Sequence, residues 1–194
     1  ENISPWFADP ALALGPVTGD NFDVVSLGDL ANPAPATVPG TITLAFAKPI
    51  RDLSGADFVI FENGHITQSN EGGVGTGGIF AELAFVEVSA DGVVFERIPA
   101  TSLTPPLVEL PGFGTRFASI DATNVHNLAG KHVNTSGESW GTPFDLADAG
   151  LSQITHIRLV DIPGNGFYKD SAGRPIYDAW KTIASGGFDL EGVG

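Results

Sequence analysis

The chain contains no cysteine, which excludes disulfides, thiolate zinc sites and cysteine nucleophiles. Its 194 residues are enough to bury a hydrophobic core without such crosslinks, and we expect a single domain, residues 1–194. Methionine is absent as well, so we expect Glu1 to follow a removed signal peptide or a trimmed segment. No apolar run reaches the length of about eighteen residues that spans a bilayer. The sequence therefore predicts no membrane insertion by this segment.

Basic residues are scarce: 9 Lys and Arg stand against 23 Asp and Glu, a net charge of −14. Binding to nucleic acid or to an anionic membrane needs Lys and Arg to neutralise phosphate, so the charge argues against both partners. An acidic surface favours divalent cations, and Ca²⁺ takes only oxygen ligands. The alternative is that the acidity only keeps the protein soluble.

No window has a sustained helical period, while several short stretches alternate β-branched or apolar residues as strands do. Lys48-Pro49 is expected to end the first of these strands, and Ala90-Asp91-Gly92 predicts a hairpin turn. The pattern predicts an all-β protein, an antiparallel β-sandwich or jelly roll. The predicted strands are Thr41–Ala47, Asp57–Phe61, Glu82–Ser89, Val93–Ile98, Ile154–Ile162 and Phe188–Val193.

One or two short helical turns are expected, from Thr123–Leu128, Asp145–Gly150 and Ala179–Ile183. The predicted loops at Gln68–Gly78, Pro99–Arg116 and Val133–Thr142 are longer than a sandwich needs. Because long loops on a rigid sheet commonly carry binding sites, we expect the ligand to bind at one end of the sandwich.

The order of motifs resembles a family of bacterial exported or cell-surface proteins, many of which carry a PEP-CTERM sorting tail. The motifs include GADFVIFEN at 55–63, FAELAFVEVSADG at 80–92, GTPFDL at 141–146, DSAGRPIYD at 170–178 and GFDLEGV at 187–193. The resemblance covers nearly the whole chain. It implies export to the periplasm, cell surface or medium, a galactose-binding-like or jelly-roll sandwich, and bound calcium. The chain differs from the sorted members in having no C-terminal apolar anchor, so surface attachment stays open. A more distant similarity is to exported corrinoid-binding proteins of gut bacteria, which implies association with uptake machinery.

Carboxylates near the C-terminal end are the best candidates for metal ligands. Asp170 begins a glycine-containing turn, and Asp178 follows eight residues later. Asp189 on the last strand and Glu62 after an earlier strand could supply further oxygens to Ca²⁺. The alternative is that Asp170 only caps its own turn and Asp178 only begins the helical turn Ala179–Ile183.

Three further carboxylates fall in predicted strands, where an unpaired charge is costly to bury. For Glu87 we expect exposure to solvent. For Glu82 and Asp161, coordination of a metal or pairing with Arg97 or Arg158 are both open.

Histidines and aromatic residues in loops are the candidate ligand contacts. His65 and His132 are either polar loop residues or axial ligands of a bound corrinoid or tetrapyrrole. Trp140 and Tyr168 lie in predicted loops and Trp180 in a predicted helical turn, where each could pack in the core or stack on a ligand.

We therefore expect an exported, calcium-stabilised binding module that recognises a glycan or another small extracellular ligand through its loops. No nucleophile motif or paired catalytic signature is evident, so non-catalytic binding is the leading hypothesis. Two alternatives remain: a protein that captures a corrinoid cofactor, and an enzyme that acts on polysaccharide, since the separation of catalytic carboxylates depends on the fold.

Overall fold

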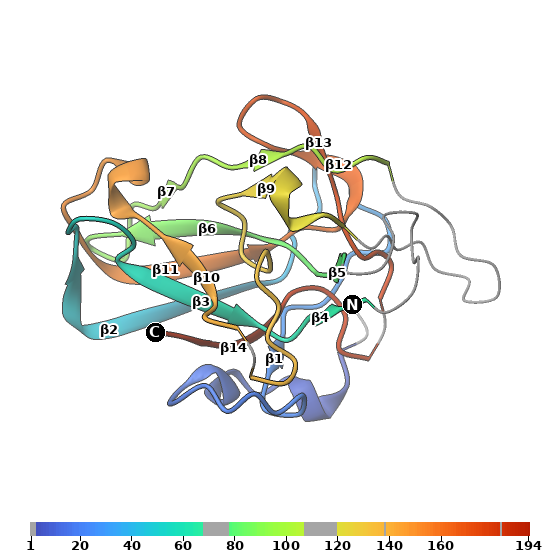
Figure 1. Cartoon of the computed structure of the whole chain (residues 1–194), viewed down its shortest axis with the longest axis horizontal. Helices are drawn as coiled ribbons and strands as arrows, with labels where there is room; N and C mark the ends of the chain where they lie inside the picture. The colour runs from blue at the N-terminus through green and yellow to red at the C-terminus, as the bar shows by residue number, and fades with distance from the viewer. Residues whose placement is uncertain (1–2, 68–77, 107–119, 138, 183) are drawn as a thin grey trace.

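A computed structural model describes residues 3–67, 78–106, 120–137, 139–182 and 184–194. Two four-stranded antiparallel sheets form its main body, as the sequence predicted for an all-β sandwich (Figure 1). The larger sheet has the order β2 (Thr41–Arg51), β11 (Gln153–Asp161), β6 (Ala84–Ser89) and β7 (Glu96–Arg97). The other has the order β1 (Val25–Ser26), β14 (Asp189–Val193), β3 (Phe58–Glu62) and β10 (Thr142–Phe144).

The main core lies between these sheets and follows from side-chain alternation along the strands. In β6, Ala84, Val86 and Val88 enter this core, while Leu83 and Phe85 belong to a second buried cluster on the other face of the same sheet. Every residue of β6 is buried, because both faces are covered. The two-sided pattern predicted for this stretch is therefore confirmed.

Short segments cover that second face. They include three two-stranded sheets and one of the four 3₁₀ turns within the described residues, whereas two other turns place Ala13 and Leu146 in the main core. The paired strands are β12 (Asn165–Lys169) with β13 (Pro175–Tyr177), β4 (His65–Ile66) with β5 (Ile79–Phe80), and β8 (Thr101–Ser102) with β9 (Val125–His126). The turns are η1 (Pro5–Phe7), η2 (Pro10–Ala13), η4 (Ala122–Asn124) and η5 (Leu146–Ala149). No helix in the described part of the chain has the length and hydropathy needed to cross a bilayer.

Two predicted boundaries were wrong. Lys48-Pro49 does not end the first strand, because β2 is an edge strand whose pairing with β11 has an irregularity between Ile154 and His156, where a proline is tolerated. Residues 179–182 form no helical turn, because the Asp178 carboxylate accepts a hydrogen bond from the distant Leu83 amide instead of capping the residues after it.

The helical turn predicted at Asp145–Gly150 is confirmed, and the one predicted at Thr123–Leu128 is confirmed only in part. Asp145 caps η5 through the Ala147 amide, and Gly150 ends it at a left-handed φ of 68°, as expected for a C-cap glycine. The stretch from Thr123 to Leu128 contains only the end of η4, followed by β9. Of the predicted long loops, residues 68–77 and 107–116 lie outside the described residues.

Candidate functional site: a buried carboxylate cluster

The strand registers bring acidic residues together at one end of the sandwich. Glu62 ends β3 opposite Leu190, the neighbour of Asp189 at the start of β14. Asp161 ends β11 opposite Ala84, and Glu82 precedes Ala84 by two residues. Because the strands are antiparallel, the ends of β3 and β11 meet the beginnings of β14 and β6. Four carboxylates from distant parts of the sequence therefore converge.

Three of them line one pocket of about 350 Å³, which we call the acidic pocket. Glu62, Glu82 and Asp189 (the outer carboxylates) are joined in its wall by aromatic side chains of Phe7, Phe22, His65 and Phe80. Phe7 and Phe22 come from the N-terminal segment, whereas His65 comes from β4 and Phe80 from β5. The pocket thus combines buried carboxylates with partly exposed rings.

Glu62 is the most unusual group in the pocket. It is 1% exposed, and neither carboxylate oxygen has a hydrogen-bond partner within the described residues. The backbone amides of Gly64 and Glu82 lie close enough to oppose the rise of its pKa, but neither makes a hydrogen bond of ordinary geometry. Burial first, and then the nearby charge of Asp189, raise the pKa of Glu62 well above its usual value.

Glu82 and Asp189 have only hydroxyl partners among their described hydrogen bonds. Thr182 Oγ1 donates to Glu82 Oε1, and Ser26 Oγ donates to Asp189 Oδ1. Burial and the Asp189 charge raise the pKa of Glu82 well above its usual value. Burial raises the pKa of Asp189 to about 7. As arranged here, the outer carboxylates favour protonation or the arrival of a cation.

A second set of buried carboxylates lies behind the pocket, outside its wall. These inner carboxylates are Asp29, Asp161 and Asp178. Asp161 Oδ1 accepts from the Phe188 amide at 2.8 Å and Asp178 Oδ2 from the Leu83 amide at 2.6 Å. Burial raises the pKa of Asp161 and Asp178 well above their usual values, and that of Asp29 to about 6. Thr182 joins the two sets, since its amide donates to Asp29 and its hydroxyl to Glu82.

The arginines that could have neutralised these groups lie elsewhere. Arg97 and Arg158 both pair with Glu87, at 2.7 and 2.5 Å, and each guanidinium stacks on a phenylalanine ring. The expectation that Glu87 faces solvent was wrong: it is 8% exposed, because opposing β-strands place two cations beside it. None of the salt bridges in the described ranges reaches an outer or inner carboxylate.

Of the predicted metal ligands, Glu62, Asp178 and Asp189 belong to the buried carboxylate cluster. Asp170 lies outside it and has partners of its own. Asp170 accepts hydrogen bonds from backbone amides, including that of Ser102, and pairs with Arg174 at 2.7 Å. These partners lower its pKa against the opposing effect of burial. Asp170 thus caps its turn, the alternative that the sequence left open. Glu82 and Asp161 are the members of the cluster whose role the sequence left undecided.

A partly exposed acidic trio has closer oxygens. Among the described residues, only Asp52, Asp57 and Asp145 present three ligand atoms within 4.8 Å of one another. However, Asp57 accepts hydrogen bonds from the Leu53 and Leu146 amides, and Asp145 caps η5. These oxygens already serve as backbone caps. The outer carboxylates do not meet this spacing, so holding a cation there requires their side chains to rotate toward one another.

The predicted ligand contacts are divided among several places. His65 lines the acidic pocket and stacks on Phe80 with a centroid distance of 5.0 Å. Tyr168 packs partly buried against the second cluster, and Trp180 donates its indole N–H to the Leu30 carbonyl at 3.1 Å. Both of these therefore have structural roles.

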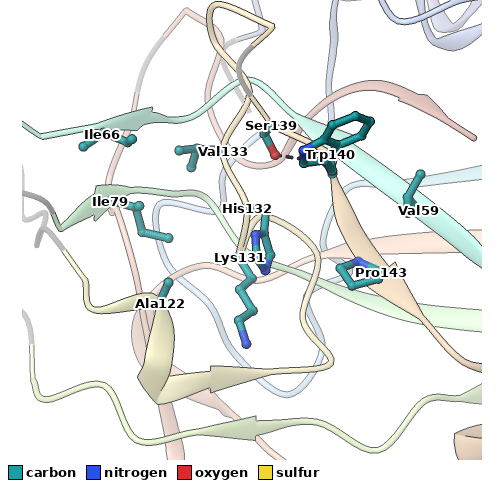
Figure 2. Close-up of a pocket in the computed structure, with 11 residues that line it drawn as sticks. Val59, Ile66, Ile79, Ala122, Lys131, His132, Val133, Ser139, Trp140 and Pro143 are labelled. Atoms are coloured by element: carbon teal, nitrogen blue, oxygen red, sulfur yellow. Dashed lines mark hydrogen bonds between the residues drawn. The ribbon is translucent and has the colours of Figure 1, made fainter. Parts of the chain in front are cut away.

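His132 and Trp140 line a different, mainly apolar cavity of about 520 Å³ (Figure 2). Trp140 is 92% exposed at its edge. Ser139 in its wall directly follows residue 138, and Ile66 and Ile79 are each separated by one residue from the segment 68–77. Residue 138 and this segment lie outside the described residues, so no function is assigned to this cavity. His65 and His132 line separate cavities, and axial ligation of a corrinoid by either one stays a prediction.

Comparisons of the chain with family models, with curated proteins and with solved structures find no match. The resemblance to exported surface proteins therefore stays a prediction, and the function must be argued from the carboxylate cluster itself.

Proposed function

We propose that the chain is a binding domain that holds Ca²⁺ in the acidic pocket through Glu62, Glu82 and Asp189. The observation that carries this proposal is Glu62, a carboxylate in the pocket wall that is 1% exposed and whose two oxygens make no hydrogen bond of ordinary geometry within the described chain. An isolated buried carboxylate costs several kcal/mol in free energy of folding, because it loses its hydration without gaining a partner. A divalent cation at this position would remove that cost.

The chemistry of the pocket favours Ca²⁺ over other divalent cations. Its charged groups are carboxylates, which are hard oxygen ligands, and cysteine is absent from the chain. Glu62 has both oxygens available, as bidentate coordination of Ca²⁺ requires. Asn63 and Thr135 also line the pocket and offer neutral oxygens. Ca²⁺ accepts six to eight such ligands in flexible geometry, whereas Mg²⁺ demands a strict octahedron.

The ligand that best fits a calcium ion in this pocket is a sugar of a glycan. A pocket of about 350 Å³ is at the small end of ligand sites, and it suits one or two sugar rings. Hydroxyl oxygens of a sugar can complete the coordination of Ca²⁺, while aromatic faces pack on its C–H groups. Phe22, 74% exposed, is available for such packing.

Calorimetric titration of CaCl₂ into chelator-treated protein tests the proposal. The wild type is expected to bind Ca²⁺, and Glu62→Gln to bind it at least tenfold more weakly, because a carboxylate ligand is replaced by an amide. Asp52→Asn is the matched control, since Asp52 belongs to the partly exposed trio and should leave affinity unchanged. Absence of binding in the wild type, or equal affinity in Glu62→Gln, contradicts the proposal.

The same pocket supports one second candidate, hydrolysis of a polysaccharide. The raised pKa of Glu62 and Glu82 is what a general acid requires, and both line a cavity that admits a sugar ring. Incubation of the protein with a panel of polysaccharides, followed by measurement of released reducing ends, separates the two. Turnover that is lost in Glu82→Gln favours the enzyme, and retention of intact glycan without turnover favours the binding domain.

A further inference from the structure

We infer that a second divalent cation binds behind the acidic pocket, between the inner carboxylates Asp29, Asp161 and Asp178. The inference rests on the proposed function, because it extends the same calcium site inward. Its first support is that Asp161 Oδ2 and Asp178 Oδ1 have no hydrogen-bond partner in the described part of the molecule. Asp161 is 1% exposed and Asp178 is fully buried.

The charges within the cluster give the second support. The outer and inner carboxylates interact with one another, since the charge of Asp161 acts on Glu82, that of Asp189 acts on Asp161, and that of Glu62 acts on Asp178. Lys181 is the cationic side chain near the inner set, where it acts on Asp29. One Ca²⁺ in the pocket therefore leaves most of the negative charge uncompensated. Two divalent cations and Lys181 together offset five of the six carboxylate charges, which lowers the cost of burying them.

Glycines pack closely against individual inner carboxylates. The three inner carboxylates do not present ligand atoms within 4.8 Å of one another, so holding a cation there also requires their side chains to rotate toward one another. Any side chain at Gly164 would overlap Asp178 Oδ1, the oxygen without a hydrogen-bond partner, so only glycine fits there. Gly187 has a φ of 72° and a backbone that lies against Asp161 and Asp29. These glycines let the chain wrap the carboxylates tightly. Oxygens of the surrounding backbone carbonyls would complete the coordination, as is common for Ca²⁺.

The two sites should differ in hydration. The pocket site opens to solvent and keeps water molecules, whereas the inner site, with all three carboxylates at most 2% exposed, excludes them. The inner cation is therefore expected to exchange slowly and to resist brief treatment with chelator. The outer cation is expected to exchange freely.

Metal content per chain tests the inference. After extended chelation and equilibrium dialysis against CaCl₂, we expect two calcium ions per wild-type chain and one in Asp161→Asn/Asp178→Asn. A ratio of one in the wild type, or of two in the double variant, overturns the second site but leaves the proposed function standing. A ratio of zero in the wild type overturns both.

A second measurement covers the case in which the double variant does not fold. Terbium ions replace Ca²⁺, and their luminescence lifetimes in H₂O and D₂O report the number of bound waters. Wild-type protein loaded with Tb³⁺ should show two lifetimes, one from a hydrated ion and one from an ion with almost no bound water. A single hydrated population overturns the inference.

Discussion

At the scale of single residues, buried carboxylates in this protein have two different environments. Glu87 lies between two guanidinium groups, which satisfy its charge. Glu62 is buried more deeply, yet it has no cationic partner within the described residues. Since burial without a partner is unfavourable, Glu87 stabilises the fold by itself, whereas Glu62 does so only when a cation is present.

This contrast predicts opposite effects of two equivalent substitutions in the presence of chelator. At pH 8, Glu62→Gln should raise the free energy of unfolding by about 1–3 kcal/mol, because a buried charge is removed. Glu87→Gln should lower it by about 1–3 kcal/mol, because two arginines lose their carboxylate. Urea denaturation followed by tryptophan fluorescence measures both. A loss of stability in Glu62→Gln without metal would show that the carboxylate has a partner in the apo protein.

Calcium should reverse the order of stability of the wild type and Glu62→Gln. With saturating CaCl₂ the wild type gains stability, by roughly 2.7 kcal/mol at a hundredfold excess over Kd. For a domain of this length this corresponds to a rise in Tm of about 5–10 °C. Glu62→Gln should gain much less, and Glu87→Gln should gain as much as the wild type. An equal rise in all three proteins would place the calcium elsewhere.

At the scale of secondary-structure elements, the ends of strands position several carboxylates of the site, among them Glu62, Asp161 and Asp189. The sequence was sufficient to place the main strands, because alternation in stretches such as Glu82–Ser89 and Phe188–Val193 directly reflects two faces of a sheet. It also identified Glu62, Asp178 and Asp189 as candidate ligands. What it could not supply was the register that sets Glu62 opposite Leu190 and Asp161 opposite Ala84, since pairing depends on contacts between distant segments.

The errors in the candidate site have the same origin. Asp170 and Asp178 look alike in sequence, each beginning a turn, but Arg174 satisfies the first locally while the second turns inward to the Leu83 amide. Glu82 precedes its strand as any loop residue might, and only tertiary packing buries it beside Asp189. Local pattern therefore located acidic residues in turns and strands but could not separate turn caps and ion-paired residues from members of the cluster.

The close approach of Gly164 to the Asp178 carboxylate gives a further prediction. Gly164→Ala should lower the free energy of unfolding by at least about 1–3 kcal/mol, because its Cβ would overlap the Asp178 carboxylate. It should also weaken binding of the second calcium ion. Gly173→Ala is the control, since nothing lies within 4 Å of its added Cβ and only its φ of 79° opposes the change. Thermal denaturation with and without calcium distinguishes the two, and equal effects would contradict tight packing around Asp178.

At the scale of the whole molecule, the cluster concentrates part of the chain's net charge of −14 in a buried site. The pKa of Asp189 rises to about 7 and that of Asp29 to about 6 in the folded protein, from ordinary values near 4. At pH values between the ordinary and the raised pKa of these groups, the metal-free folded state binds more protons than the unfolded state. Its stability must therefore fall as the pH rises.

This linkage predicts opposite pH dependences for the two forms. Without metal, Tm should decrease from about pH 5 to about pH 7.5, because folding must then hold ionised carboxylates in a buried cluster. With calcium bound, protons compete with the ion, so Tm should instead increase over the same range. Differential scanning calorimetry at several pH values, with EDTA or with CaCl₂, measures both. Parallel curves would show that the metal does not bind these carboxylates.

The most direct measurement of the central claim is the position of the ion itself, from anomalous diffraction of crystals grown with CaCl₂ or soaked in Tb³⁺. We predict one anomalous peak between Glu62, Glu82 and Asp189, and a second among Asp29, Asp161 and Asp178. A map with no peak at the outer carboxylates, or with its only peak at Asp52, Asp57 and Asp145, would contradict the account.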